Sequence, residues 1–467
     1  MENSLSRIKY RTLSSVARVI DEVTDVVLSW VGNISKDLSR SQDVDKLLSR
    51  MHECVNPKGG EVKARHNTIS LGNLYLQLSE VGKTRFLCLL NDHFSSKREE
   101  IEDRVSRYIE NTDDSLEEKL RFDLASALSS PRLSILKQFM SLEEGVKFLV
   151  DMRADVITLT RKGKSFFALE RDLKNVLSSL FDVGLLELRH ITWDSPASML
   201  EKLIFYEAVH AISSWEDLRH RLDSDRRCFA FFHYKMPREP LIFVEVALVD
   251  DVADNVQELL DDSVPKKDPR DAKVAIFYSI SNTQVGLVGI NLGNFLIKRV
   301  VSMLSSEFDN IGTYATLSPI PGFVRWLTGI LSEGDVALRD MGVIYSAETL
   351  MQYVDSINSD ARCIPLVCQG LFLKLCARYL STQSGSRVID PVAHFHLSNG
   401  ASIRRLNWMA DSSQKGLSSS LGIMVNYSYE PNRIDDNYEA YVVHGKVIYS
   451  KEVAALLKNT KRREGAG

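Results

Sequence analysis

Apolar residues recur three and four positions apart through much of the first 190 residues, with charged residues between them. This spacing places the apolar side chains on one face of a helix. Asp113, which precedes Ser115 and two glutamates, has the pattern of a helix start, and Ser130-Pro131 has that of a break between helices. We therefore predict helices over residues 15–31, 74–94, 115–128, 142–152 and 166–188.

Beyond residue 190 the pattern changes to short runs of β-branched and aromatic residues. These runs predict strands over 228–233, 241–248 and 273–281. Helical segments alternate with them, and the polar stretch 261–271 is typical of a surface loop. A chain of 467 residues is too long for one core. We therefore predict a helical domain over residues 1–190 and a mixed α/β domain over residues 191–467.

Three glycines separate the strand that begins at Lys273 from a helical segment that begins at Phe295. They are Gly286, Gly289 and Gly293. A strand, a glycine loop and a helix start can hold a pyrophosphate on backbone N–H groups, which predicts a nucleotide or coenzyme A as ligand. The spacing differs from the Rossmann G-x-G-x-x-G, so a dinucleotide is not the first expectation. A tight turn that binds nothing would also use glycine.

Composition and charge exclude several classes of protein. A net charge of −4 gives no general nucleic-acid footprint. The six cysteines lack C-x-x-C spacing, so we expect reduced thiols and neither a zinc ribbon nor a redox motif. Uninterrupted apolar runs stay shorter than the roughly 18 residues of a membrane-spanning helix. We expect a soluble protein with no nucleic-acid or membrane partner.

Familiar catalytic motifs are incomplete in this sequence. Gly82-Lys83-Thr84 and Gly163-Lys164-Ser165 resemble the end of a P-loop, but Gln77 and Thr158 occupy the place of its first glycine. H-E-x-x-H and G-x-S-x-G are absent from the sequence. His210, His233 and His394 are scattered, without acidic partners at metal spacing. The sequence therefore supports neither a metal mechanism nor an esterase mechanism.

Two polar residues remain as candidates for chemistry, each with an ordinary structural alternative. Ser318 precedes Pro319, which favours an extended backbone at a strand end, although many serines in this context are turn hydroxyls. His396 lies between Phe395 and Leu397 in a segment that we predict to be a strand. A half-buried, hydrogen-bonded histidine is the alternative for this residue.

Several blocks of sequence resemble the malonyl-CoA decarboxylase family and occur in the family's order. The resemblance extends over most of residues 140–450, and the first hundred residues are less diagnostic. The blocks are 148–155, 169–177, 283–287, 292–299, 317–323, 391–401, 406–411 and 424–427.

This resemblance implies an α+β fold, with an all-helical N-terminal domain followed by a GNAT (acetyltransferase)-like mixed α/β catalytic domain. It implies that the catalytic pair is Ser318 and His396. At Asn291 some family members carry a carboxylate, so that residue's acid role cannot be assigned here. The family's malonyl-CoA-binding loop falls on Val288, Gly289, Ile290, Asn291, Leu292, Gly293 and Asn294.

The implied reaction converts malonyl-CoA to acetyl-CoA and CO₂ through a thioester enolate, as part of fatty acid metabolism. No cofactor is expected, because the thioester itself accepts the electrons. The helical domain of residues 1–190 is expected to form a homo-oligomer, a tetramer or a dimer. Neither end of the chain carries a convincing targeting signal, so we expect a cytoplasmic protein. Two other functions stay open: an N-acetyltransferase that uses acetyl-CoA, and a non-catalytic acyl-CoA sensor.

Overall fold

The computed structural model describes residues 34–56, 60–290, 296–340, 343, 345–356 and 365–458. The chain divides into two compact units, of which one is residues 1–182 with 284–290 and the other is residues 183–283 with 291–467. The predicted helix over 15–31 lies outside the described residues. The fold class is confirmed, because helices at the N-terminal end are followed by a unit that contains a mixed sheet.

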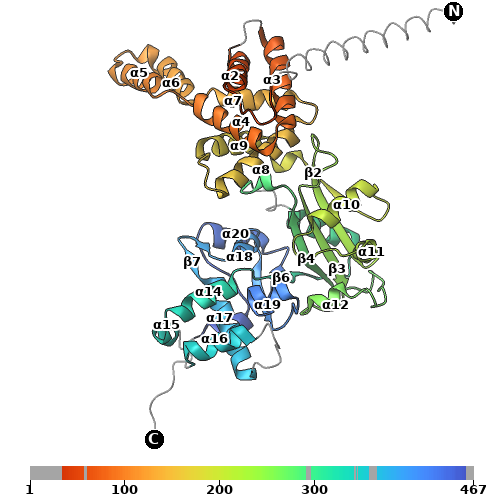
Figure 1. Ribbon diagram of the computed structural model, residues 1–467. Coiled ribbons are helices and arrows are strands. Elements are labelled where there is room, and N and C mark those ends of the chain that lie inside the picture. The colour runs from red at the N-terminus through yellow and green to blue at the C-terminus, as the bar shows by residue number, and fades with distance from the viewer. Residues whose placement is uncertain are drawn as a thin grey trace, which may run out of the picture. The chain divides into compact units, whose positions relative to one another are not determined.

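The first unit is a set of packed helices (Figure 1). Leu47, Phe86, Leu149 and Leu173 are fully buried and come from four different helices, so the apolar faces of these helices meet in one interior. Its described helices are α2 (Ser41–Val55), α3 (Gly60–Gln77), α4 (Glu80–His93), α5 (Arg98–Glu110), α6 (Asp114–Leu128), α7 (Arg132–Gln138), α8 (Gly145–Arg161) and α9 (Phe167–Leu180), with the short 3-10 turns η1 (Phe139–Ser141) and η3 (Val285–Leu287).

The helix predictions hold where local signals mark the ends. The helix predicted over 115–128 is confirmed as α6, and Asp113 caps it by accepting a hydrogen bond from the Ser115 N–H. The single helix predicted over 74–94 is wrong, because Ser79 begins a new helix by accepting from the Gly82 N–H at 3.2 Å. The helix predicted over 166–188 is too long. It ends at Leu180, and strand β1 (Leu186–Ile191) begins soon after.

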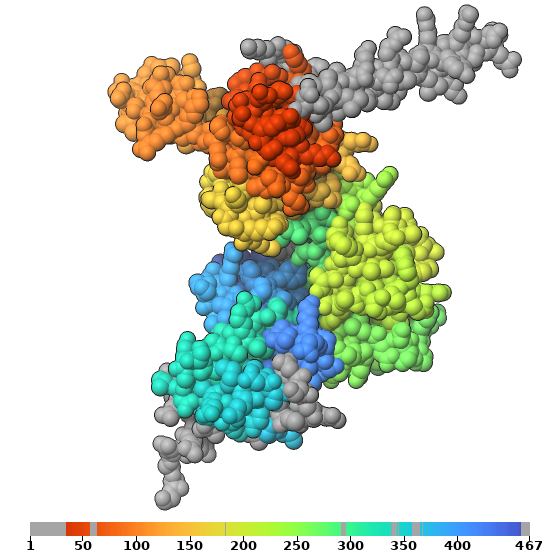
Figure 2. Space-filling view, in the orientation of Figure 1, coloured from red at the N-terminus to blue at the C-terminus, as the bar shows by residue number. Residues whose placement is uncertain are grey.

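Helices α5 and α6 pack against each other and extend from the other helices of their unit (Figure 2). None of the residues in either helix is buried. Large apolar side chains are instead exposed on the pair, among them Ile109 (73 %) and Phe122 (74 %). An exposed apolar surface of this kind is a common feature of protein–protein contacts.

The second unit is built on an eight-stranded sheet with the order β1-β2-β3-β4-β5-β10-β6, in which β9 also pairs with β10. The pair β4–β5 is parallel, and the other pairs of this sheet are antiparallel. The predicted strands 228–233, 241–248 and 273–281 are confirmed as β2, β3 and β4. The strands after β1 are β2 (Arg226–His233), β3 (Ile242–Val249), β4 (Val274–Asn282), β5 (Thr313–Thr316), β6 (Ser318–Pro319), β9 (Ser402–Asn407) and β10 (Met424–Tyr429), and β7 (Gln383–Ser384) pairs with β8 (Arg387–Val388).

Helices cover this sheet, and the buried core contains Ile276, Ala315 and Met424 from three of its strands. The turn η2 (Val183–Leu185) precedes β1. The described helices are α10 (Ala197–Tyr206), α11 (Trp215–Arg221), α12 (Val256–Leu260), α13 (Leu296–Glu307), α14 (Phe323–Ser332), α15 (Asp335–Asp340), α16 (Ala347–Ser356), α17 (Leu366–Ser381), α18 (Pro391–Leu397), α19 (Gln414–Ser420), α20 (Ile434–Val442) and α21 (Lys451–Leu457).

The two parallel strands share only part of their length. The register of β4 with β5 ends where Phe277 faces Thr316, whereas β4 continues to Asn282. The residues of β4 beyond Phe277 pair with β3 on the other side. The sheet is therefore open beside the part of β4 that follows Phe277, near the end of β5 and the start of β6.

Candidate active site

A cavity of about 350 Å³ lies in the second unit, beside the part of β4 that extends past β5. Both catalytic candidates, Ser318 and His396, line it. Most of the other lining residues are apolar, and none of the described lining residues carries a formal charge at neutral pH. These others are Val209, Phe277, Tyr278, Ile280, Asn282, Pro319, Pro391, Val392 and Phe395.

Ser318 begins β6, as its position before Pro319 suggests. Strand β10 pairs with both β5 and β6, and Val425 lies opposite Ser318. The serine is 5 % exposed, so strand pairing and burial fix its position. Thr316 lies two residues earlier, and because strand side chains repeat every second residue, both hydroxyls can face the same side.

His396 lies in helix α18, and the strand predicted around it is wrong. Asp390 caps this helix by accepting a hydrogen bond from the Ala393 N–H at 2.8 Å, and Pro391 occupies the first position. A capping carboxylate followed by proline is a signal of a helix start, and it was present in the sequence. The helix places the His396 side chain, 2 % exposed, in the cavity.

The two candidates are hydrogen-bonded to each other, since His396 Nε2 lies 3.0 Å from Ser318 Oγ. The other ring nitrogen, Nδ1, lies 2.8 Å from the Tyr429 hydroxyl. Ser318 Oγ donates to Thr316 Oγ1 at 2.8 Å, and this oxygen also accepts from the Tyr427 N–H at 3.1 Å. We assign the proton to Nε2. The Tyr429 hydroxyl then donates to Nδ1, Nε2–H donates to Ser318 Oγ, and each group in this series of hydrogen bonds has a partner.

The environment of His396 keeps its imidazole neutral. Burial lowers the pKa of His396 to about 3, because a charged imidazolium is poorly solvated in the cavity. Both ring nitrogens contact hydroxyl groups rather than a carboxylate, and the Tyr427 ring stacks on the imidazole with 4.4 Å between centroids. Burial also raises the pKa of the Tyr429 phenol well above its ordinary value, so the phenol keeps its proton.

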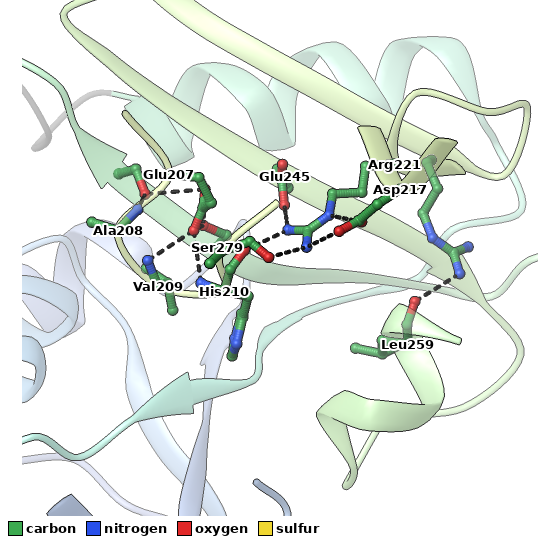
Figure 3. Close-up of polar contacts among 12 residues, drawn as sticks. Glu207, Ala208, Val209, His210, Asp217, Arg221, Glu245, Leu259 and Ser279 are labelled. Atoms are coloured by element: carbon green, nitrogen blue, oxygen red, sulfur yellow. Dashed lines mark hydrogen bonds and ion pairs between the residues drawn. The ribbon is translucent and has the colours of Figure 1, made fainter. Parts of the chain in front are cut away.

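A buried polar network fixes the wall of the cavity that contains Val209 (Figure 3). The Glu207 carboxylate accepts from the backbone N–H groups of Val209 and His210 at 2.8 and 2.9 Å and from the Ser279 hydroxyl at 2.8 Å. Arg221 donates to the His210 carbonyl at 2.9 Å. The N–H groups of Val209 and His210 and the carbonyl of His210 are all hydrogen-bonded. This segment therefore holds Val209 in one position.

The described part of the expected coenzyme A loop belongs to the helical unit, because residues 284–290 group with α8. At Gly286 a Cβ atom would overlap the Val150 carbonyl oxygen, so this glycine is required for close packing on α8. Arg153 donates to the Gly286 and Val288 carbonyls at 2.6 and 2.9 Å. Gly289 has a φ of +75°, which favours glycine. Asn291, Leu292, Gly293 and Asn294 lie outside the described residues.

Tyr429 and Thr316 are site residues that the sequence did not reveal. Tyr429 ends β10, where its alternating pattern resembles that of any buried strand. Thr316 is two positions before Ser318 and was detectable from strand periodicity. Across the described ranges, no group of three or more histidines, cysteines or acidic residues is placed to hold an ion.

Two family models match the chain: the malonyl-CoA decarboxylase C-terminal domain over residues 184–466, and the malonyl-CoA decarboxylase N-terminal domain over residues 94–181. The mitochondrial malonyl-CoA decarboxylase of Mus musculus is 37 % identical over 366 residues, which are 73 % of each chain. The mitochondrial protein of Anser anser anser is 36 % identical and is covered over 71 % of its length.

Solved structures agree with these matches. The malonyl-CoA decarboxylase of Agrobacterium vitis has a TM-score of 0.79 and 34 % identity, with 88 % of this chain and 99 % of that chain covered. The enzyme of Cupriavidus metallidurans has a TM-score of 0.70 and 38 % identity, with 89 % and 100 % covered. The similarity therefore includes both units of the fold.

Proposed function

The chain belongs to the malonyl-CoA decarboxylase family, and from that premise we propose that Ser318 and His396 carry out the decarboxylation of malonyl-CoA in the apolar cavity. The observation that carries this proposal is the 3.0 Å hydrogen bond between Ser318 Oγ and His396 Nε2 inside a buried cavity. The proposed products are acetyl-CoA and CO₂.

The neutral lining of the cavity favours loss of CO₂. A malonyl carboxylate placed there loses its hydration and finds no lysine or arginine among the described lining residues. As the carbon–carbon bond breaks, its electron pair moves onto the thioester and CO₂ leaves uncharged. The negative charge thus leaves the carboxylate and spreads over an enolate, whose oxygen accepts hydrogen bonds from nearby donors. Preorganised donors of this kind contribute about 3 to 4 kcal/mol each.

The proton that completes acetyl-CoA comes from His396 in this proposal. His396 stays neutral while the carboxylate is present. The negative charge of the enolate that forms when CO₂ leaves raises the pKa of the imidazole, because a negative charge nearby favours the imidazolium form, and His396 then takes up a proton from solvent. After CO₂ has left, Ser318 Oγ–H gives its proton to the enolate carbon and receives one from His396 Nε2. The imidazole is neutral again when acetyl-CoA leaves.

The test is a product assay with the purified protein and malonyl-CoA, with acetyl-CoA and CO₂ both measured. We expect His396→Ala to lower kcat by a factor of about 100 to 10,000, the range for loss of a general acid, while acetyl-CoA still binds. His394→Ala is the matched control, because His394 lies on the same helix and contacts Tyr441 rather than the cavity. An unchanged kcat in His396→Ala would exclude the proposed role.

The same assay separates the two other functions. An N-acetyltransferase would modify an added amine and would leave malonyl-CoA intact. A non-catalytic sensor would bind acetyl-CoA and form neither product. The close pairing of Ser318 with His396 favours the decarboxylase over both.

We further propose that the protein is a homo-oligomer, a tetramer or a dimer, formed through the α5–α6 pair. The pair has no buried residue and exposes Ile109, Leu116, Phe122 and Leu128, a surface that a second copy could cover. Phe122→Glu should reduce the molar mass measured by light scattering. Glu118→Gln on the same helix should not, and an unchanged mass in Phe122→Glu would move the contact elsewhere.

A place in the cytoplasm and a role in fatty acid metabolism also remain proposals. The vertebrate relatives are named as mitochondrial. Across the part of the chain that the structure describes, no helix is long and apolar enough to cross a membrane.

A further inference from the structure

A second cavity, of about 600 Å³, lies wholly within the helical unit. Its walls are the last turns of α8, the turn from α8 to α9, the first turns of α9, and Val288. The turn contains Gly163, whose φ is +89°, followed by Lys164 and Ser165. The sequence Gly163-Lys164-Ser165, which is not a Walker A motif, therefore faces an open space large enough for a small molecule.

The cavity carries an excess of positive charge in a chain whose net charge is −4. Its lining contains four cationic residues and one carboxylate, Glu170. Glu170 is already paired with Arg153, at 2.6 Å. Three cations remain, and among the described residues none of them forms an ion pair with a carboxylate: Arg161, Lys164 and Lys174. A concave surface of one sign of charge attracts ligands of the opposite sign.

An aromatic ring lies at the same wall. Phe167, the first residue of α9, lines the cavity and is 74 % exposed. The Arg171 guanidinium lies over this ring, 5.9 Å from its centroid. An exposed phenylalanine beside cations is suited to a ligand with both a flat ring and a phosphate, since bases stack on aromatic side chains. Helix α9 has no side-chain cap, so its positive end adds to the attraction for an anion.

We propose that this cavity binds the phosphorylated adenosine end of coenzyme A, with its 3′-phosphate on Lys164 and Lys174 and its adenine on Phe167. The proposal rests on the proposed function, because it extends the binding of the same substrate. Lys174 links the cavity to the glycine loop, since its Nζ lies 3.4 Å from the place where a Cβ atom of Gly289 would be. Val288 lines the cavity directly before that glycine.

The test measures binding of three probes to the full-length protein by calorimetry. The probes are coenzyme A, dephospho-coenzyme A, which lacks the 3′-phosphate, and adenosine 3′,5′-bisphosphate. We expect the wild type to bind coenzyme A about tenfold more tightly than the dephospho form, since charged hydrogen bonds to phosphate are stronger than neutral ones. The double variant Lys164→Ala/Lys174→Ala should bind coenzyme A and dephospho-coenzyme A with equal affinity, which is lower than the affinity of the wild type for coenzyme A.

Two further variants make the result specific. Phe167→Ala should weaken all three probes by about tenfold, because stacking does not depend on the 3′-phosphate. It should leave the preference for coenzyme A over the dephospho form intact. Lys119→Ala removes an exposed lysine from α6 of the same unit and should change neither affinity nor preference.

Kinetics separate this proposal from the proposed function. The double lysine variant should raise KM for malonyl-CoA about tenfold with kcat unchanged, as expected for an interaction made equally in ground state and transition state. An unchanged preference for the 3′-phosphate in that variant would overturn the proposal even if decarboxylation is normal. ATP that binds here without displacement by coenzyme A would also overturn it. A wild type that shows the preference but forms no acetyl-CoA would overturn only the proposed function.

Discussion

The two cavities differ in the formal charge of the residues that line them. The one around Ser318 and His396 has a lining without formal charge, and its central histidine is neutral because it is buried. The one at the start of α9 is lined by three cations that pair with no carboxylate among the described residues and lie close to solvent. In the proposed function the neutral cavity destabilises the carboxylate that is lost, and in the further proposal the cationic cavity holds a phosphate that takes no part in the reaction. Chemistry and binding thus require different surroundings, and variants in each cavity should affect different measurements.

The largest expected effect is on the stability of the helical unit. Arg153→Ala removes a 2 % exposed guanidinium that binds Glu170, the Gly286 carbonyl and the Val288 carbonyl. The substitution removes the hydrogen bonds of one guanidinium to three partners, and a buried acceptor left without its donor costs about 1 to 3 kcal/mol, so we expect a loss of about 3 to 5 kcal/mol in the free energy of unfolding, which urea titration measures. Arg161→Ala in the same cavity should change it by less than about 0.5 kcal/mol. Equal losses in the free energy of unfolding in Arg153→Ala and Arg161→Ala would contradict the stabilising role assigned to Arg153.

The next effect concerns catalysis alone. Ser318→Ala should lower kcat by about 100-fold, within the range for losing a proton-transfer or oxyanion partner. Calorimetry should find the affinity for coenzyme A unchanged, because the cationic cavity is untouched. Ser384→Ala, an exposed serine of β7, serves as the control. Full activity in Ser318→Ala would make this residue a buried structural hydroxyl.

A third effect is a dependence of stability on pH. His396 has its pKa lowered from 6.5 to about 3 in the folded protein, so the unfolded chain takes up a proton that the folded protein does not. The stability from this group is complete above pH 6.5 and is lost as pH falls toward 3. Between neutral pH and pH 5 the loss is about 2 kcal/mol. Urea titration should show that the free energy of unfolding falls less between pH 7 and pH 5 in His396→Asn than in the wild type, by that amount. An equal fall in the two proteins would contradict a neutral imidazole.

The smallest effect concerns the glycine loop. Gly289→Ala should cost about 1 to 2 kcal/mol of stability, because alanine is strained at a φ of +75°. The methyl group would also meet Lys174 at ordinary contact distance, so coenzyme A affinity should fall if Lys174 binds the phosphate. A melting curve and a titration of the same variant separate these two effects. Normal affinity in the folded variant would reduce Gly289 to a turn residue.

The sequence predicted elements whose ends carry local signals. Helix α6 has its capping aspartate, and strand β4 has a continuous β-rich run. The error at His396 arose because the apolar residues around it suit a strand as well as a short helix. Asp390 and Pro391 carried the better signal, since a cap and a first-position proline have a direct physical meaning.

The sequence was less informative about long-range packing. Gly286 was one of three glycines of the predicted phosphate loop, and in the structure it packs against the backbone of α8, more than 130 residues earlier. Tyr429 completes the hydrogen bonds of His396 from a different strand, and no spacing rule connects the two residues. Such contacts depend on how separate elements pack, which local patterns do not encode.

The chain passes between the two units at three points, after residues 182, 283 and 290. If the two halves of a protein cut after residue 182 were pulled apart, the Gly286 segment would lose its packing on Val150 and its hydrogen bond from Arg153. The helical fragment would keep a charged guanidinium without two of its acceptors, and the other fragment would expose a segment made to lie against a helix. We therefore expect that neither half can be exchanged for that of an unrelated protein. Limited proteolysis after residue 182 should leave two fragments that copurify.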